Sequence, residues 1–516
     1  MMFRGSPSLS ADQLSEISAA VGGSFDADTQ QTVTQYYFTA PAEDLKLVLH
    51  IEAIRMRGVD DTEALWKEER GAIEQEVARD HSNPFEVFYL KMLQALYKGT
   101  PLANSGLGTR PSFNKTTGAM LKKFYDEWYA PNNAILVIVG DVEPHQALAE
   151  VTGFFNNIPA KTLPARPEIH LQPVKAESLN IPSDFPFGVA ALSFRLPGTN
   201  SPDYAATEVL NDVLNSQRGT LYALVPQGKA IFAEFETQSL PQSGLGIALA
   251  GYPQGANSTA LVSQIHSILA DDIKNGFPAD LVAAAKRHEL TDEELQKNSV
   301  SGLASEWSQA VAIEGRRSPE DDLKAMERVT VQDVDRVARQ YLTLNDTIAA
   351  VLPPQPSGKP VSRSSFGGAE SFAPKHVKAV PLPTWASQAL AKLAVPEATV
   401  HPLVSTLPNG IKLIVQPESV DNTISVYGHI KSNPDLEIPK GQEGASSVLD
   451  QLFSFGTTTL NRIEFQKALD EIGADESAGL DFSLQVLANH FQRGVQLLAE
   501  NELQPALPAR AFAIMQ

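Results

Sequence analysis

The chain has 516 residues, 43% of them hydrophobic, so it is long enough for several domains with cores of their own. Asp and Glu outnumber Lys and Arg by 61 to 41, and the net charge of −20 argues against nucleic acid and anionic membranes as partners. The chain contains no cysteine, which excludes disulfides, thiolate nucleophiles and Cys-ligated metals.

The N-terminal sequence MMFRGSPSLS has no basic segment followed by an apolar one, so this sequence shows no secretion signal. Its longest apolar runs have the length of a strand and not of a membrane span.

Residues 1–165 alternate helical and strand patterns, which predicts a first domain. Ser10 is a candidate N-cap, and the Gly22-Gly23 pair a stop, for the first helix. The patterns predict helices at 10–21, 42–56, 61–80 and 119–128, and strands at 32–39 and 134–139. This mixture indicates an α/β or α+β sandwich.

Residues 175–352 repeat the theme and predict a second, homologous domain. Its segment 337–352 parallels 124–140, with Tyr341 matching Tyr129 and Asn345 matching Asn133. The predicted elements are strands at 187–196, 244–250 and 347–351, and helices at 203–214, 259–275 and 331–341.

Residues 353–402 contain nine prolines and predict an extended linker between two halves. Residues 403–516 then begin a second half, opening with a hairpin whose turn is Asn409-Gly410. At an offset of 451, residues 452–474 match residues 1–23, and after a gap residues 489–504 match 43–58. The second half therefore restarts the first.

The repeat predicts that the chain is cut at both ends. The later copy has about fifty residues before LFSFG that the earlier copy lacks, and Gln516 falls where the next helix would begin. The alternative is a divergent repeat with natural ends.

The helix predicted at 61–80 places two carboxylates on its apolar face. At about 100° per residue, Glu69 and Glu76 lie two turns apart on one side, with Trp66 and Ile73 beside them. Burying an unpartnered carboxylate is costly, and a cation, an arginine or a metal removes that cost. The alternative is that this face only grazes the core and both carboxylates reach water.

The ten histidines supply no matching metal motif. Sites of the H-x-x-E-H or H-E-x-x-H type need two histidines one helical turn apart, and no such pair occurs here. A nucleophile elbow and a phosphate-binding loop are absent as well.

The segment MMFRGSPSLSADQLSEISAAVGG resembles the stretch that follows the inverted zinc motif H-x-x-E-H in the pitrilysin/insulinase family of zinc metallopeptidases. ERGAIEQE at 69–76 resembles the distal E-x6-E element of that family, and YAPNNAILVIVGDV its domain-closing unit. The resemblance implies an α+β fold: duplicated sandwich domains, each a mainly antiparallel sheet covered by helices, in two halves joined by the Pro-rich linker.

The resemblance also implies roles for individual residues. Glu76 is expected to be the third zinc ligand and Glu69 the carboxylate that orients the site. The two histidines and the general-base glutamate of the family are absent from this chain. Substrate peptide is expected to add as a strand to a sheet edge near Thr29, Thr32 and Thr34.

These roles imply a fragment of a zinc-dependent peptidase that acts on peptides or small proteins in a closed chamber. The chain itself is expected to be catalytically incomplete and to hold zinc weakly or not at all. The alternative is a non-catalytic, peptide-binding or assembly subunit of the same fold. The resemblance points to the bacterial periplasm or export, while the sequence predicts neither compartment, cleavage specificity nor oligomeric state.

Overall fold

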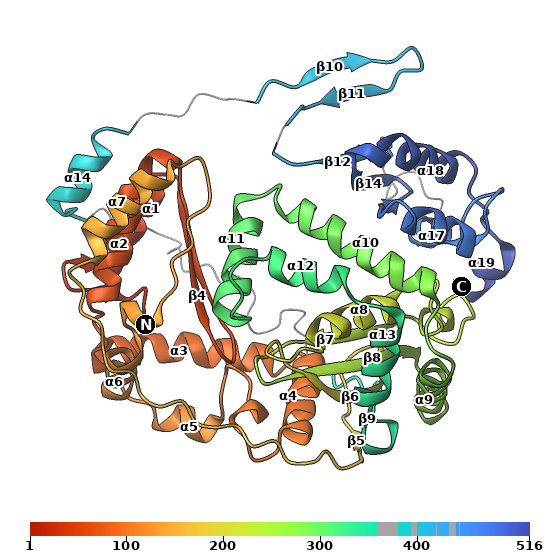
Figure 1. Cartoon of the computed structure of the whole chain (residues 1–516), viewed down its shortest axis with the longest axis horizontal. Helices are drawn as coiled ribbons and strands as arrows, with labels where there is room; N and C mark the ends of the chain where they lie inside the picture. Colours follow the sequence, from red (N-terminus) through yellow and green to blue (C-terminus); the bar gives the residue numbers. More distant parts are fainter. Residues whose placement is uncertain (359–379, 394–399, 419, 433–439, 443, 516) are drawn as a thin grey trace. The chain divides into compact units, whose positions relative to one another are not determined.

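The computed structural model describes residues 1–358, 380–393, 400–418, 420–432, 440–442 and 444–515 (Figure 1). The chain divides into two compact units. Unit 1 comprises residues 1–171 and 303–308 and the described residues of 380–418; unit 2 comprises 172–302 and 309–358 and the described residues from 420 onward. No helix in the described parts combines the length and apolar character that spanning a membrane requires.

Unit 1 is mostly helical, with three two-stranded sheets. Its strands pair as β1 with β2, β3 with β4, and β10 with β11, all antiparallel. The elements are β1 (Gly5–Ser6), β2 (Leu9–Ser10), α1 (Ala11–Ala20), β3 (Ser24–Thr29), β4 (Thr34–Thr39), α2 (Leu45–Arg57), α3 (Glu63–Asp80), α4 (Pro84–Leu96), α5 (Arg110–Lys115), α6 (Gly118–Trp128), α7 (Pro144–Phe155), α14 (Thr384–Leu390), β10 (Leu403–Thr406) and β11 (Lys412–Val415).

The predicted Pro-rich linker contains a helix that packs on the core of unit 1. In α14, Ala386 is fully buried against the cluster formed by α1 and α2. Trp385 packs on His50 in a tilted arrangement with ring centroids 4.2 Å apart, and Gln13 donates a hydrogen bond to the Pro381 carbonyl at 2.8 Å. The proline count predicted extended chain here, whereas the apolar spacing of Trp385, Ala386 and Ala389 supports a short docked helix. Much of the remaining predicted linker lies outside the described residues.

Two strand predictions in unit 1 need correction. The predicted strand at 32–39 begins only at Thr34, because residues 30–33 form a turn in which Gln30 N–H bonds to the Val33 carbonyl at 2.9 Å. Residues 134–139 form no strand, and Ile135 and Leu136 are half exposed. An apolar run becomes a strand only with a ladder partner, and no described strand pairs with these residues.

Unit 2 contains a five-stranded sheet in the order β5-β9-β6-β8-β7, antiparallel except for β5 and β9. Its long central strands are buried on both faces, and helices α8, α9, α10 and α13 complete the core (Figure 1). The elements are β5 (Glu177–Asn180), β6 (Phe187–Pro197), α8 (Tyr204–Asn215), β7 (Ala233–Gln238), β8 (Ser243–Pro253), α9 (Ser258–Asn275), α10 (Ala279–Gln296), α12 (Glu320–Glu327), α13 (Val331–Tyr341) and β9 (Ile348–Leu352); α11 (Val300–Ser308) belongs in part to each unit.

The remainder of unit 2 has a core separate from that of the large sheet. A three-stranded antiparallel sheet in the order β12-β14-β13 packs against α17 and α18. The elements are β12 (Thr423–His429), α16 (Ala445–Leu452), α17 (Arg462–Asp470), β13 (Asp475–Ser477), β14 (Asp481–Leu487), α18 (Phe491–Leu503) and α19 (Ala509–Met515).

The two stretches that match in sequence contain elements in the same order, and we call residues 1–57 the first copy and residues 452–503 the second copy. Gly5 and Gly456, 451 apart, both have positive φ, of +135° and +88°. Gly22 and Gly473 likewise have φ of +66° and +57°. The element pairs are α1 with α17, β3 with β13, β4 with β14, and α2 with α18.

Candidate functional site

Helix α3 carries the two predicted site carboxylates and is anchored at its beginning. Thr62 caps it by accepting a hydrogen bond from Leu65 N–H. The Glu63 carboxylate accepts from Gly118 N–H at 2.9 Å, and the buried Trp66 indole donates to the Thr116 carbonyl at 2.9 Å. These contacts attach α3 to the start of α6 and fix the direction of its next two turns.

Glu69 is buried and paired with a cation. It is 6% exposed, and its Oε2 accepts from Nε and Nη2 of Arg4. The Met1 ammonium lies 4.0 Å from Oε1, and burial lowers the pKa of that ammonium. A cation, an arginine or a metal can each offset the cost of burying a carboxylate, and at Glu69 the structure has an arginine.

Glu76 lies two turns further along α3 and is half-buried. Glu74 faces another side, where its Oε1 accepts from Arg70 at 3.3 Å and from Arg110 at 3.1 Å. The sequence left open that both carboxylates on the inner face reach bulk water. Glu69 does not, because it is buried, and Glu76 is only partly exposed.

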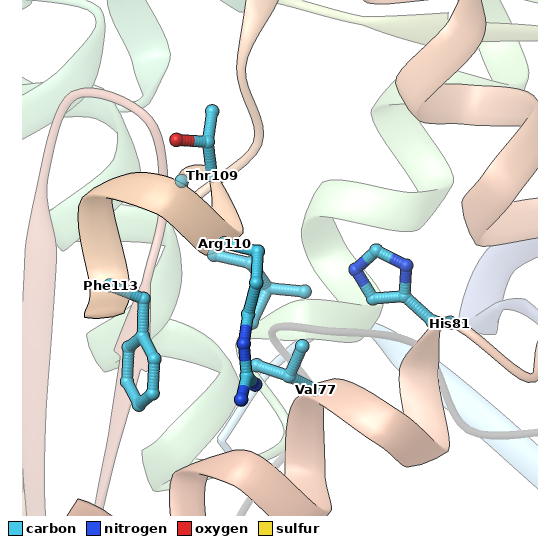
Figure 2. Close-up of a pocket in the computed structure, with 7 residues that line it drawn as sticks. Val77, His81, Thr109, Arg110 and Phe113 are labelled. Atoms are coloured by element: carbon cyan, nitrogen blue, oxygen red, sulfur yellow. The ribbon is translucent and has the colours of Figure 1, made fainter.

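A small pocket adjoins the end of α3, one turn beyond Glu76. Figure 2 shows Val77, His81, Arg110 and Phe113 around it, with the Arg110 guanidinium also 5.6 Å from the Phe113 ring centroid. Its lining residues are Val77, His81, Leu107, Gly108, Thr109, Arg110 and Phe113. The pocket brings a cation and an imidazole to the Glu76 end of the helix.

An aromatic cluster around Arg55 lies beneath the hairpin of β3 and β4, and the sequence patterns did not predict it. The Arg55 guanidinium carbon is 4.4 Å from the Phe3 ring centroid and 5.1 Å from that of Tyr36. The hydroxyls of Tyr36 and Tyr129 are 2.6 Å apart, and burial raises the pKa of both. Phe3 and Arg4 are neighbours in MMFRG but contact different partners: Phe3 contacts Arg55, and Arg4 contacts Glu69.

The predicted peptide-binding residues gather at one end of the hairpin. Thr29 and Thr34 are cross-strand partners, and Thr32 lies in the turn between them. β3 pairs with β4 on one side, and no described strand pairs with its other side. β3 is therefore an edge strand in the described structure.

The residues around Glu76 do not fit a zinc ion by themselves. Zinc sites in proteins use three or four ligands from Cys, His and carboxylates. In the described residues only His288, Asp292 and Asp475 come together as three such side chains, and they belong to unit 2. There the two ring nitrogens of His288 point to different carboxylates, at 2.9 Å from Asp292 and 3.6 Å from Asp475, which is the geometry of ion pairing.

Family models match the chain in two adjacent stretches. The model of the insulinase family, peptidase family M16, matches residues 1–110, and that of the peptidase M16 inactive domain matches residues 115–288. Together they span more than half of the chain.

Relatives and solved structures agree with these matches. An uncharacterized zinc protease of Streptomyces coelicolor is 24% identical over 381 residues, covering 68% of this chain and 79% of the relative. A protease from Helicobacter pylori has a TM-score of 0.63 at 21% identity, covering 68% of this chain and 87% of that one. The periplasmic protease PqqL from Escherichia coli has a TM-score of 0.59 at 16% identity, covering 100% of this chain and 61% of that one. The predicted α+β peptidase fold is confirmed, and the chain belongs to the insulinase family of peptidases.

Proposed function

We propose that α3 supplies the acidic part of a zinc peptidase site, with Glu76 as a metal ligand and Glu69 as the carboxylate that supports it. The observation that carries the proposal is the burial of Glu69 on the inner face of α3, two turns from Glu76. A supporting carboxylate orients ligands and tunes the metal, and it works best when its own position is fixed. The Arg4 pair fixes Glu69 in this way.

The substrate in this proposal is an extended peptide or unfolded protein segment, bound as an added strand along β3 within an enclosed chamber. Strand addition uses main-chain hydrogen bonds, so it tolerates many sequences. Support comes from the outer side of β3, with which no described strand pairs, and from the family membership.

The chain itself binds peptide but does not hydrolyse it in this proposal. Its sequence contains no H-x-x-E-H, so it supplies neither the two imidazole ligands nor the general base of the family. A single carboxylate competes poorly with water for zinc, and occupancy by this chain alone is therefore weak or absent.

Peptide binding is tested by fluorescence anisotropy with a labelled, unstructured peptide. The matched control is the same peptide with alternate backbone amides N-methylated, which removes the donors for strand pairing but keeps the side chains. We expect binding of the first peptide and a loss of at least about tenfold for the second, because main-chain bonds supply the affinity. Equal affinity for the two peptides contradicts strand addition.

A non-catalytic subunit of the same fold is the second candidate function. It is favoured by the pairing of Glu69 with Arg4 and by the lack of three ligands at Glu76 among the described residues. Reading the DNA upstream of the Met1 codon separates the two. A frame that encodes H-x-x-E-H ending just before Met1 supports the peptidase, and an in-frame stop codon there supports the non-catalytic subunit.

The proposed compartment is the bacterial periplasm, supported by the description of PqqL as a periplasmic protease. Fractionation of cells that express the native gene tests it, and recovery only with a cytoplasmic marker enzyme contradicts it.

A further inference from the structure

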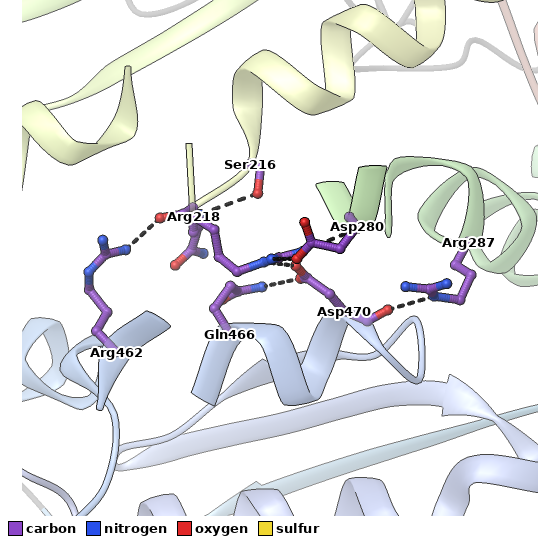
Figure 3. Close-up of polar contacts among 8 residues, drawn as sticks. Ser216, Arg218, Asp280, Arg287, Arg462, Gln466 and Asp470 are labelled. Carbon is purple, nitrogen blue, oxygen red and sulfur yellow. Dashed lines mark hydrogen bonds and ion pairs between the residues drawn. The ribbon is translucent and has the colours of Figure 1, made fainter. Parts of the chain in front are cut away.

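A polar contact within unit 2 joins the second copy to the large-sheet domain. Arg218 follows α8 and is almost buried, with its side chain 7% exposed. Its Nε donates to Asp470 Oδ2 at 2.6 Å, and its Nη1 donates to Asp280 Oδ2 at 2.7 Å (Figure 3). One guanidinium thus bridges a carboxylate of the large-sheet domain and a carboxylate of the second copy.

Asp470 is held from several sides at the C-terminal end of α17. Its Oδ1 accepts from Gln466 at 2.9 Å, and its main-chain carbonyl accepts from Arg287 Nε at 2.9 Å (Figure 3). Two arginines therefore meet the end of a helix that carries partial negative charge. Asp280 lies in the first turn of α10, and the hydrogen bond from Arg218 lowers the pKa of its carboxyl.

Further polar contacts extend this junction. Arg462 at the start of α17 donates to the Gln217 carbonyl, and Asn298 donates to the Thr423 hydroxyl at 2.8 Å. His288 on α10 faces Asp475 on β13. The buried apolar clusters of the two parts share no residue.

The internal repeat shows that these groups are not needed to form the repeated fold. At the offset of 451, Arg462, Gln466 and Asp470 correspond to Ala11, Ser15 and Ala19 of α1. Both helices form with the same caps, although α1 has small side chains at all three positions. The polar side chains of Arg462, Gln466 and Asp470 are therefore not needed to form α17, and we assign them to its contacts with other elements.

We propose that Arg218 is the docking residue that holds the second copy on the large-sheet domain, with Asp470 as its specific partner. The partner is residues 452–503 of the same chain. Because the nearly buried Arg218 guanidinium is the centre of this junction and the surrounding contacts are polar, the second copy is a separately releasable part of unit 2.

The test follows the distance between two spin labels along a urea series. The chain has no cysteine, so Ser267→Cys on α9 and Gln496→Cys on α18 give two unique labelling sites at surface positions. Asp470→Asn removes the partner charge while leaving the Arg218–Asp280 pair intact. The matched control is Glu471→Gln, which removes the same charge from the neighbouring exposed residue.

We expect one narrow distance in the parent and in Glu471→Gln at low urea. Asp470→Asn should lower the ratio of docked to undocked molecules about tenfold or more at a given urea concentration, since it leaves a nearly buried guanidinium half paired. Arg218→Ala should release the second copy as well, and circular dichroism of that variant shows whether the domains themselves remain folded. Unchanged distances in Asp470→Asn, or an equal effect of Glu471→Gln, overturn the proposal.

Discussion

The two copies of the repeat share their local backbone but differ in the width of the sheet they build. In both copies, a helix capped by a hydrogen-bonding box is followed by a glycine with positive φ and then by a strand pair in the same register. Ser24 pairs with Thr39 in the first copy, and the corresponding Asp475 pairs with Gln485 in the second. Outside the second copy, β12 pairs with β14 as a third strand, whereas no described strand pairs with the corresponding side of β4.

This difference indicates that caps, turns and strand register depend on residues nearby in sequence. The number of strands in a sheet depends on residues that are distant in sequence. The same lesson holds for the two domain-closing units. Residues 348–352 form β9 between β5 and β6, but residues 134–139, which have a similar pattern, form no strand. Backbone N–H and C=O groups that are exposed and lack a ladder partner form hydrogen bonds with water.

The largest predicted effect concerns the core that the third strand helps to cover. Leu484 on β14 is fully buried, while the corresponding Phe38 on β4 is only partly buried. Leu484→Ala should lower the free energy of opening β14 by about 3 kcal/mol, because it removes buried methyl groups and leaves a cavity. Hydrogen exchange of residues 481–487 measures this, and a loss no larger than that caused by Phe38→Ala in β4 contradicts the comparison.

The next effect concerns a pair that only the first copy has. Phe455 stands in the second copy where Arg4 stands in the first, so the Arg4–Glu69 pair has no counterpart there. Arg4→Ala should destabilise α3 by about 2 kcal/mol, less than for a fully buried pair because the Arg4 side chain is 42% exposed. The measure is hydrogen exchange of α3. Arg70→Ala, which breaks the exposed pair with Glu74, is the control and should cost less than about 1 kcal/mol.

A smaller effect should be equal in the two copies. Ser10→Ala and Asn461→Ala each remove a side-chain cap and should each weaken the following helix by about 1 kcal/mol. Exchange rates of the first-turn amides of α1 and α17 measure both. A cost at one cap without a cost at the other would show that the copies are not locally equivalent.

The smallest effect is a pH dependence at the contact between α10 and the second copy, where His288 and Asp292 of α10 meet Asp475 of β13. Hydrogen bonds to Asp292 and Asp475 raise the pKa of His288 to about 11, against the opposing effect of burial. Asp212 also interacts with His288, and burial raises the pKa of its carboxyl to about 9. Because the folded value is raised, the stabilisation is complete below the unfolded value of about 6.5 and is lost as pH rises through about 11. NMR titration of the His288 ring measures it, and a midpoint near the unfolded value contradicts it.

The sequence predicted most helices and the long strands of unit 2, because periodicity and caps are local. The glycines that the sequence comparison paired, Gly5 with Gly456 and Gly22 with Gly473, all have positive φ. The sequence did not predict the docked helix α14, because nine prolines concealed the apolar spacing around Ala386. It predicted that Glu69 lies on the inner face of its helix, but it did not predict that Arg4 is the partner of Glu69. Pairing between residues 65 apart in sequence depends on the fold.

The proposal that Glu76 belongs to a zinc site, which this chain does not complete, is tested by a calorimetric zinc titration and a peptide-cleavage assay on the same sample. The reference protein carries His288→Gln, which removes the other three-ligand group among the described residues. The same protein with Glu76→Gln added is compared with it. We predict weak zinc binding that Glu76→Gln weakens further, with no cleaved peptide. Tight zinc binding together with peptide hydrolysis that depends on Glu76 would contradict the proposal. Zinc binding with the same affinity before and after Glu76→Gln would contradict it as well.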